Sequence, residues 1–371
     1  MTEQLKLKLN DSKATRWGAL VIVAFTMMAA YYVNDVVAPL KTMLETDLAW
    51  SSTDFGFFTG GYSFLNVFFL MLIWGGLILD RFGIRFTGKL ATILMVGGTA
   101  LEYYAMTGLA GADATLFGIN EIFGYKTGVF VAFAGYSIFG VGAEVAGITV
   151  SKIIAKWFKG KELATAMGVQ VALARIGSQA GYAVAIPLAR AFGISTPVLL
   201  GLVLLLGGMI AFFIFAVMDK KLDKQMEAAA IAAGTEDEEE KFSFKDVKNI
   251  LVNPGFWLIA LLCVLFYSCV FPFQKFASEL MIIKYGINEN VAGTFAGLPA
   301  LGALILTPVF GGFIDKRGKS ASIMLLGSAM LICVHFIYAI PDINYWLVAI
   351  VLMIILGIAF SPVSYTHLRA H

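Results

Sequence analysis

The sequence predicts an all-α polytopic membrane protein, and three observations carry this prediction. Ten apolar runs begin near residues 17, 55, 88, 128, 163, 196, 255, 291, 321 and 345, and each can supply the roughly 20 residues that a helix needs to cross a bilayer. The 371-residue chain is 59% hydrophobic and only 14% charged, whereas about a quarter of the residues in a soluble domain are charged. None of the runs alternates with period two, which excludes a transmembrane β-barrel.

The connections between the runs alternate in charge. Most of the 27 Lys and Arg residues lie in the N-terminus, at 81–89, at 152–161, after Met218 and at 316–319. Short basic loops stay in the cytoplasm. The pattern therefore places the N-terminus in the cytoplasm. We expect a multi-pass protein in the lipid bilayer of the plasma (cell inner) membrane. No cleavable signal peptide is expected, and the three cysteines have no disulfide or zinc spacing.

One long polar segment divides the chain. We predict an N-terminal six-helix bundle over 1–218, a cytoplasmic linker with an interfacial helix over 219–254, and four helices over 255–364. The last residues, 365–371, read YTHLRAH and resemble nothing before them, so we expect a non-native tail there. The alternative is a natural ten-helix protein with a polar end.

A short motif occurs once in each half. GLILDRFGIR at 76–85 and GGFIDKRGK at 311–319 place Gly, Asp, a base and Gly at the same spacing. Related halves joined by a loop indicate a transporter with its site between them, and six helices are then expected in the second half as well. We interpret the motif as a gate at the cytoplasmic helix ends, and positive-inside anchoring is the alternative; its residues are Gly76, Asp80, Arg81, Gly83, Arg85, Gly311, Asp315, Lys316 and Gly318.

Two charges stand where a membrane helix ordinarily has none. Glu144 and Arg175 lie in consecutive apolar runs, about 12 and 20 Å above the basic turn at 152–161. A charge at this depth costs roughly 2.5–3.5 kcal/mol on insertion scales and ordinarily faces a bundle interior or a water-filled cavity. Arg binds a carboxylate through two hydrogen bonds, and Glu accepts from an ammonium group or carries a proton. We predict a site for a small zwitterion; a permanent Glu144–Arg175 ion pair is the alternative.

Further polar side chains lie deep in the predicted helices. Tyr62 and Asn66 are one turn apart and are candidates for binding peptide groups, although interhelical hydrogen bonds explain them equally well. Gln170 and Ser178 flank Arg175 and are candidates for orienting it. Residues 31–35 (YYVND) are assigned to helix capping or anchoring, and Lys275 with Glu279 to a pair that extends to the membrane surface.

The repeated motif resembles the signature of the major facilitator superfamily. GVGAE at 140–144, WFKGKELATAMGVQ at 157–170 and ARIGS at 174–178, with YSFLN at 62–66 and FPF at 271–273, resemble the branch that includes the lysosomal dipeptide uniporter. The resemblance implies a two-bundle transporter of prokaryotic type, truncated after its tenth helix. It also implies that Glu144 holds the amino group of a dipeptide and Arg175 its carboxylate.

The expected function is transport of a small zwitterionic solute, most simply a dipeptide, by alternating access. An organic-anion transporter of the same fold is the alternative, with Arg175 on the anion and Glu144 serving a proton. A membrane protein that acts as a receptor without transporting is a third class. We expect a monomer that is not an enzyme, with no cofactor, no metal and no nucleic-acid partner, since the sequence contains no phosphate loop, nucleophile elbow or metal-ligand cluster.

Overall fold

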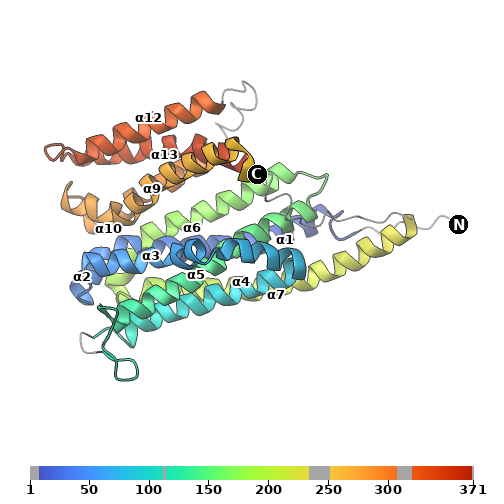
Figure 1. Cartoon of the computed structure of the whole chain (residues 1–371), viewed down its shortest axis with the longest axis horizontal. Helices are drawn as coiled ribbons and strands as arrows, with labels where there is room; N and C mark the ends of the chain where they lie inside the picture. Colours follow the sequence, from blue (N-terminus) through green and yellow to red (C-terminus); the bar gives the residue numbers. More distant parts are fainter. Residues whose placement is uncertain (1–7, 112–113, 234–250, 307–319, 370–371) are drawn as a thin grey trace.

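The protein folds into two helical halves that lie side by side (Figure 1). The computed structural model describes residues 8–111, 114–233, 251–306 and 320–369. The N-terminal half contains α1 (Lys13–Val36), the 3₁₀ turn η1 (Ala38–Leu40), α2 (Lys41–Asp47), α3 (Ser52–Phe68), α4 (Met71–Thr107), α5 (Thr127–Trp157), α6 (Leu163–Phe192) and α7 (Thr196–Ala233).

The C-terminal half packs along α6, η1 and α2 of the first half. It contains α9 (Pro254–Ile283), α10 (Glu289–Ala296), α12 (Ser320–Ala339) and α13 (Trp346–Arg369). A short antiparallel hairpin precedes α5, and its strands β1 (Glu121–Ile122) and β2 (Tyr125–Lys126) have two residues each. We call the end of the bundle nearest the N-terminus the near end, and the opposite end, which carries α2 and α10, the far end (right and left in Figure 1).

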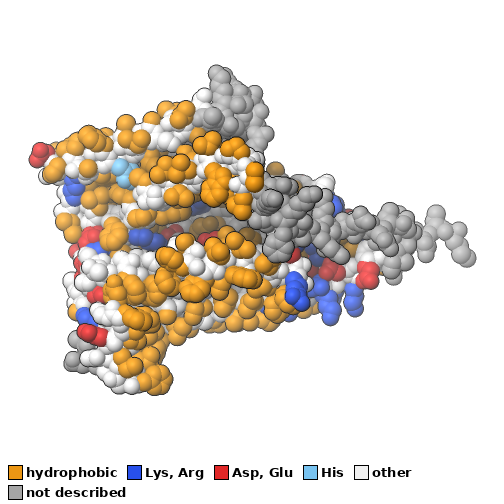
Figure 2. Space-filling view, viewed as in Figure 1, with side chains coloured by type: hydrophobic (Ala, Val, Ile, Leu, Met, Phe, Trp, Pro, Cys, Tyr) orange, Lys and Arg blue, Asp and Glu red, His pale blue; other side chains and the backbone are white. Residues whose placement is uncertain are grey.

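The predicted all-α polytopic fold is confirmed. Six described helices are long and apolar enough to cross a membrane, and the pair α3 and α4, bent by 58°, makes a seventh. Hydrophobic side chains cover the flanks of both halves, and charged ones gather at the helix ends (Figure 2). This distribution suits a lipid surround, because hydrocarbon leaves a charged side chain unsolvated.

Local chemistry explains where helices begin and bend. Ser51 and Asp54 form a reciprocal capping box at the start of α3. Gly83 interrupts α4 with φ +74° and ψ 172°, a conformation that glycine adopts without steric cost. The second and third predicted apolar runs therefore join through α4, which bends at Gly83 inside the first copy of the predicted gate motif.

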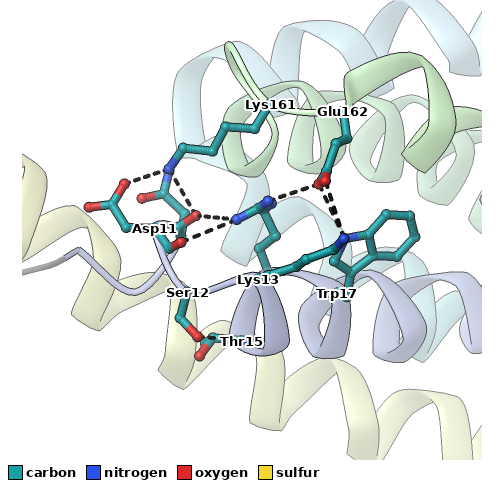
Figure 3. Close-up of polar contacts among 9 residues, drawn as sticks. Asp11, Ser12, Lys13, Thr15, Trp17, Lys161 and Glu162 are labelled. Carbon is teal, nitrogen blue, oxygen red and sulfur yellow. Dashed lines mark hydrogen bonds and ion pairs between the residues drawn. The ribbon is translucent and has the colours of Figure 1, made fainter.

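The N-terminal segment is tied to the turn between α5 and α6 at the near end (Figure 3). Arg16, buried at 6% exposure, donates to Glu162 Oε2 at 2.8 Å, and Trp17 Nε1 donates to the same oxygen at 3.3 Å. Lys161 donates to Asp11 Oδ1 and to the carbonyl of Asn10. The bond from Arg16 holds the pKa of Glu162 below its usual range, and the bond from Lys161 does the same to the pKa of Asp11.

Two predictions about the linker can be placed only in part. α7 continues to Ala233, so the first part of the predicted linker is helical. The acidic run and most of the predicted interfacial helix fall within 234–250, outside the described residues.

Candidate functional site

Glu144 lies on α5 and faces α3. The hydroxyl of Tyr62 donates to Glu144 Oε1 at 2.8 Å. Asn66, one turn further along α3, donates to the carbonyl of Tyr62 at 3.1 Å, while its own Oδ1 is buried without a partner among the described residues. α3 thus presents a hydroxyl to the carboxylate, together with an amide oxygen that is free to accept a further hydrogen bond.

Arg175 lies on α6 between two aromatic rings from different halves. Its guanidinium carbon is 5.8 Å from the centre of the Tyr31 ring on α1 and 5.2 Å from that of Phe360 on α13. In the part of the chain that the structure describes, it has no ion pair and donates no hydrogen bond. Arg175 is therefore a half-buried cation at the seam between the halves without an anionic partner.

Tyr31 connects the charges of this region. Arg175, Glu144 and Asp35 all interact electrostatically with it. Tyr31 and Asp35, which the sequence predicts to cap or anchor their helix, lie instead in the polar seam. Their signal in the sequence was a cluster of four polar residues inside one apolar run.

A cavity of ≈ 30 Å³ lies beside Arg175 in this seam. It is lined from the N-terminal half by Tyr31, Asn34, Asp35, Arg175, Ser178 and Tyr182, and from the C-terminal half by Phe271, Gln274, Pro299, Ala300 and Phe360. Ligand pockets ordinarily measure roughly 300–1,000 Å³, so a dipeptide would fit only after the halves separate. A wider hollow of ≈ 350 Å³ on α9 is almost wholly apolar and contains none of the predicted site residues.

Two further candidates flank Arg175 on α6. Ser178 is buried in the cavity wall, and its Oγ has no hydrogen-bond partner in the described chain. Gln170 is half-buried and does not line the cavity. Of the predicted site residues on this helix, the structure therefore brings Arg175 and Ser178 together.

The first copy of the gate motif makes its contacts inside the N-terminal half. Asp80 accepts from Lys152 at 2.9 Å, and Arg85 pairs with Asp219 at 3.3 Å and with Asp223. Arg81 lies over the Phe82 ring, Gly83 forms the bend in α4, and Gly76 leaves room for a Cβ atom. The second copy, with Gly311, Asp315, Lys316 and Gly318, lies outside the described residues, and the gating role stays a prediction.

Two ion pairs between the halves lie at the far end. Lys41, with 2% of its side chain exposed, donates to Glu279 on α9 at 2.5 Å and to Glu45 at 2.7 Å. Arg190 on α6 pairs with Glu289 on α10. Gln179 and Tyr182 on α6 also donate to backbone carbonyls of the C-terminal half. We call these contacts the far-end seal.

The assignment of Lys275 and Glu279 as a pair that extends to the membrane surface was wrong. Lys275 points into the seam, where it donates to Asn34 O at 2.5 Å and to Tyr136 Oη at 3.2 Å and lies 3.5 Å from Asp35 Oδ1, while Glu279 binds Lys41. Both side chains find partners on the facing half, which the spacing within their own helix could not reveal.

The fold and the polar seam define a polytopic, two-bundle membrane protein of the transporter class. The chain belongs to the Major Facilitator Superfamily, because the model of that family matches residues 19–369. The family resemblance seen in the sequence is thereby confirmed.

Curated relatives are named lysosomal dipeptide transporter MFSD1. The Homo sapiens protein is 27% identical over 362 residues, covering 94% of this chain and 70% of the relative. The Gallus gallus protein is 31% identical over 240 residues, covering 61% of this chain and 51% of the relative.

Solved structures share the fold at low sequence identity. A D-xylose–proton symporter has a TM-score of 0.63 at 16% identity and covers 93% of this chain and 80% of its own. Tetrameric PepTSo2 has a TM-score of 0.63 at 12% identity and covers 95% of this chain and 84% of its own. At these identities the likeness shows the fold alone.

Proposed function

We propose that this protein transports dipeptides by alternating access, with Arg175 binding the substrate carboxylate and Glu144 its amino group. The observation that carries the proposal is Arg175, a half-buried cation at the seam without an anionic partner in the described chain. A guanidinium offers a planar fork that matches a carboxylate. The names of the MFSD1 relatives support the choice of substrate.

Each end of a dipeptide has a binding group in this site. Glu144 carries the negative charge that attracts an ammonium group, and the Tyr62 hydroxyl fixes its orientation. Asn66 Oδ1 and Ser178 Oγ are buried and unpartnered in the described structure, so they are available to the peptide group. Burying such atoms unpaired is costly, and a ligand that pairs them gains affinity.

The orientation follows from charge. The near end carries four basic residues, Arg16, Lys152, Lys156 and Lys161. We therefore place the near end in the cytoplasm. We expect the protein to be a monomer in the plasma membrane. The far-end seal then faces outside. Asp80, Arg81 and Arg85 at the near end form half of the gate, which is expected to stabilise the outward-open state.

Ligand binding to the purified protein tests the proposal. Alanyl-alanine, free alanine and oxalate are compared by thermal shift, and a ligand at a hundredfold excess over Kd stabilises the folded state by about 2.7 kcal/mol. A shift with the dipeptide that is lost in Arg175→Ala supports the site. A shift with oxalate alone supports the organic-anion alternative, and no shift with the dipeptide contradicts the proposal.

Uptake into proteoliposomes then assigns the two charges. Glu144→Gln and Arg175→Lys are each expected to abolish dipeptide uptake while the protein still folds. Glu121→Gln, on the exposed hairpin, is the matched control and keeps wild-type uptake. Near-normal uptake in either site variant removes that residue from the site.

A further inference from the structure

Glu102 on α4 is a second acid at membrane depth that the proposed substrate site does not use. Its side chain is fully buried at 0% exposure, and neither carboxylate oxygen has a hydrogen-bond partner among the described residues. The backbones of α4 and α5 approach closely at this level, because a Cβ atom at Gly135 would lie 2.9 Å from the backbone nitrogen of Glu102. An ionised carboxylate in such a place would be strongly destabilising, whereas a neutral carboxylic acid costs much less to bury.

The neighbouring cation is already satisfied. The ammonium of Lys275 has three donors, and it has three acceptors in Asn34 O, Tyr136 Oη and Asp35 Oδ1. Asp35 also accepts from the Asn34 side chain at 2.9 Å. Lys275 and Asp35 thus neutralise each other's charge. Glu102 has no ion-pair partner among the described residues.

Among the residues that the structure describes, the remaining elements around Glu102 bring no second cation. Lys275 of α9 interacts with it electrostatically, as does Tyr136 of α5, which also interacts with Asp35 of α1 and Tyr182 of α6. The charged residues that α7 contributes to packing against α4 lie at the near end, where Asp219 and Asp223 pair with Arg85 and Lys156. In the sealed structure the favourable form of Glu102 is therefore the protonated one.

We propose that Glu102 is a proton-binding site that couples sealing of the far end to the uptake of one proton. Lys275 belongs to the C-terminal half, and Glu102, Tyr136 and Asn34 belong to the N-terminal half. When the far end opens, Lys275 leaves, water reaches Glu102, and the carboxyl group releases its proton. When the far end closes, the group rebinds a proton, so acid favours the sealed conformation. This inference rests on the alternating access proposed above.

A distance between the halves measures this coupling. Spin labels replace Asp47 on α2 and Asp342 in the turn before α13, both exposed, in a protein whose three cysteines are changed to serine. Electron–electron double resonance then gives the sealed and open populations between pH 5.5 and 8.5. One coupled proton changes their ratio by up to about tenfold per pH unit. A ratio that does not change with pH overturns the proposal.

Substitution assigns the proton to its residue. Glu102→Gln retains the shape of the neutral acid, and it is expected to be sealed at all pH values. Glu102→Met, a second variant without charge, is expected to do the same. The control Glu121→Gln keeps the wild-type response. A full pH response in a folded Glu102 variant overturns the assignment. If neither variant folds, a wild-type ratio that does not change with pH still overturns the proposal.

A second experiment, with a dipeptide added, tests this inference separately from the proposed function. Alanyl-alanine is added at fixed pH and the same distance is measured. A shift with the dipeptide but none with pH contradicts the proton site and leaves the transport proposal standing. A shift with pH but none with the dipeptide supports the proton site and contradicts the choice of substrate.

Discussion

The hydroxyl of Tyr62 on α3 donates a hydrogen bond of 2.8 Å to Glu144 on α5. This bond sets the orientation of the carboxylate before a substrate arrives. Tyr62→Phe removes the donor and leaves the ring, so we expect KM for dipeptide uptake to rise about tenfold, which corresponds to about 1.4 kcal/mol. The maximal rate should stay within about twofold.

Tyr104→Phe is the matched control for that variant, because Tyr104 is exposed near the C-terminal end of α4 and lies outside the site. Uptake kinetics in proteoliposomes make the comparison. An unchanged KM in Tyr62→Phe would show that the hydroxyl does not prepare the site.

The near end contains a buried acid that we expect to be structural. Asp219 is 0% exposed and accepts from Lys156 at 2.8 Å, from Trp157 Nε1 at 3.0 Å and from Arg85 at 3.3 Å. Asp219→Asn leaves these donors poorly matched and should lower the free energy of unfolding by about 3–5 kcal/mol. Thermal unfolding in detergent measures the loss, and a melting temperature equal to that of the wild-type protein would contradict it.

Asp80→Asn separates gating from folding at the same end. Its ion pair with Lys152 is about half exposed on both sides, so its loss should change stability by at most about 1 kcal/mol. Dipeptide uptake should fall, while the set of peptides that compete for uptake stays the same. Altered selectivity would argue against a purely gating role.

Glycine at 293 allows the halves to touch. A Cβ atom there would lie 2.2 Å from the carbonyl oxygen of Tyr182 across the seam. We expect Gly293→Ala to keep the far end apart, so that a cysteine placed at Gln274 in a cysteine-free protein reacts several-fold faster with an impermeant thiol reagent added outside. Gly60→Ala, which meets no atom within 4 Å, should leave the rate unchanged. Equal rates in the two variants would show that this contact does not control closure.

The ion pair between Arg16 and Glu162 predicts that the stability of the folded protein depends on pH. Because Arg16 holds the pKa of Glu162 below its usual range, the ionised form stabilises the folded state. That stabilisation is complete above the unfolded value near 4.3 and is lost as the pH falls through the lower folded value. The melting temperature of Glu162→Gln should therefore lie below that of the wild-type protein at pH 7, and the difference should shrink below about pH 4. A constant difference would exclude the link.

Composition and loop charge were enough to predict the polytopic fold, because hydrocarbon imposes long apolar helices on any chain that crosses it. The same reasoning selected Glu144 and Arg175, since a charge at membrane depth needs a polar neighbour. It could not tell which helix faces which. Lys275 and Glu279 therefore seemed to belong together, and their partners Asp35 and Lys41 lie on the facing half.

Glu102 also shows that the sequence does not reveal which way a helix faces. It is a lone acid within an apolar run, as Glu144 is, but the sequence does not reveal that its side chain is fully buried. Burial of a single side chain depends on the rotation of its helix, which packing against neighbouring helices and anchors at the membrane interface set together.

The far-end seal joins two ion pairs of different character. Arg190 and Glu289 are both more than 40% exposed, whereas Lys41 is 2% exposed beside Glu279. Dissolved salt weakens exposed charges over a Debye length of about 8 Å at physiological ionic strength, and it reaches buried charges much less. The ion pair between Lys41 and Glu279 is therefore weakened much less than the exposed pair when the salt concentration rises. Closure of the far end should therefore depend only weakly on the salinity of the surrounding solution.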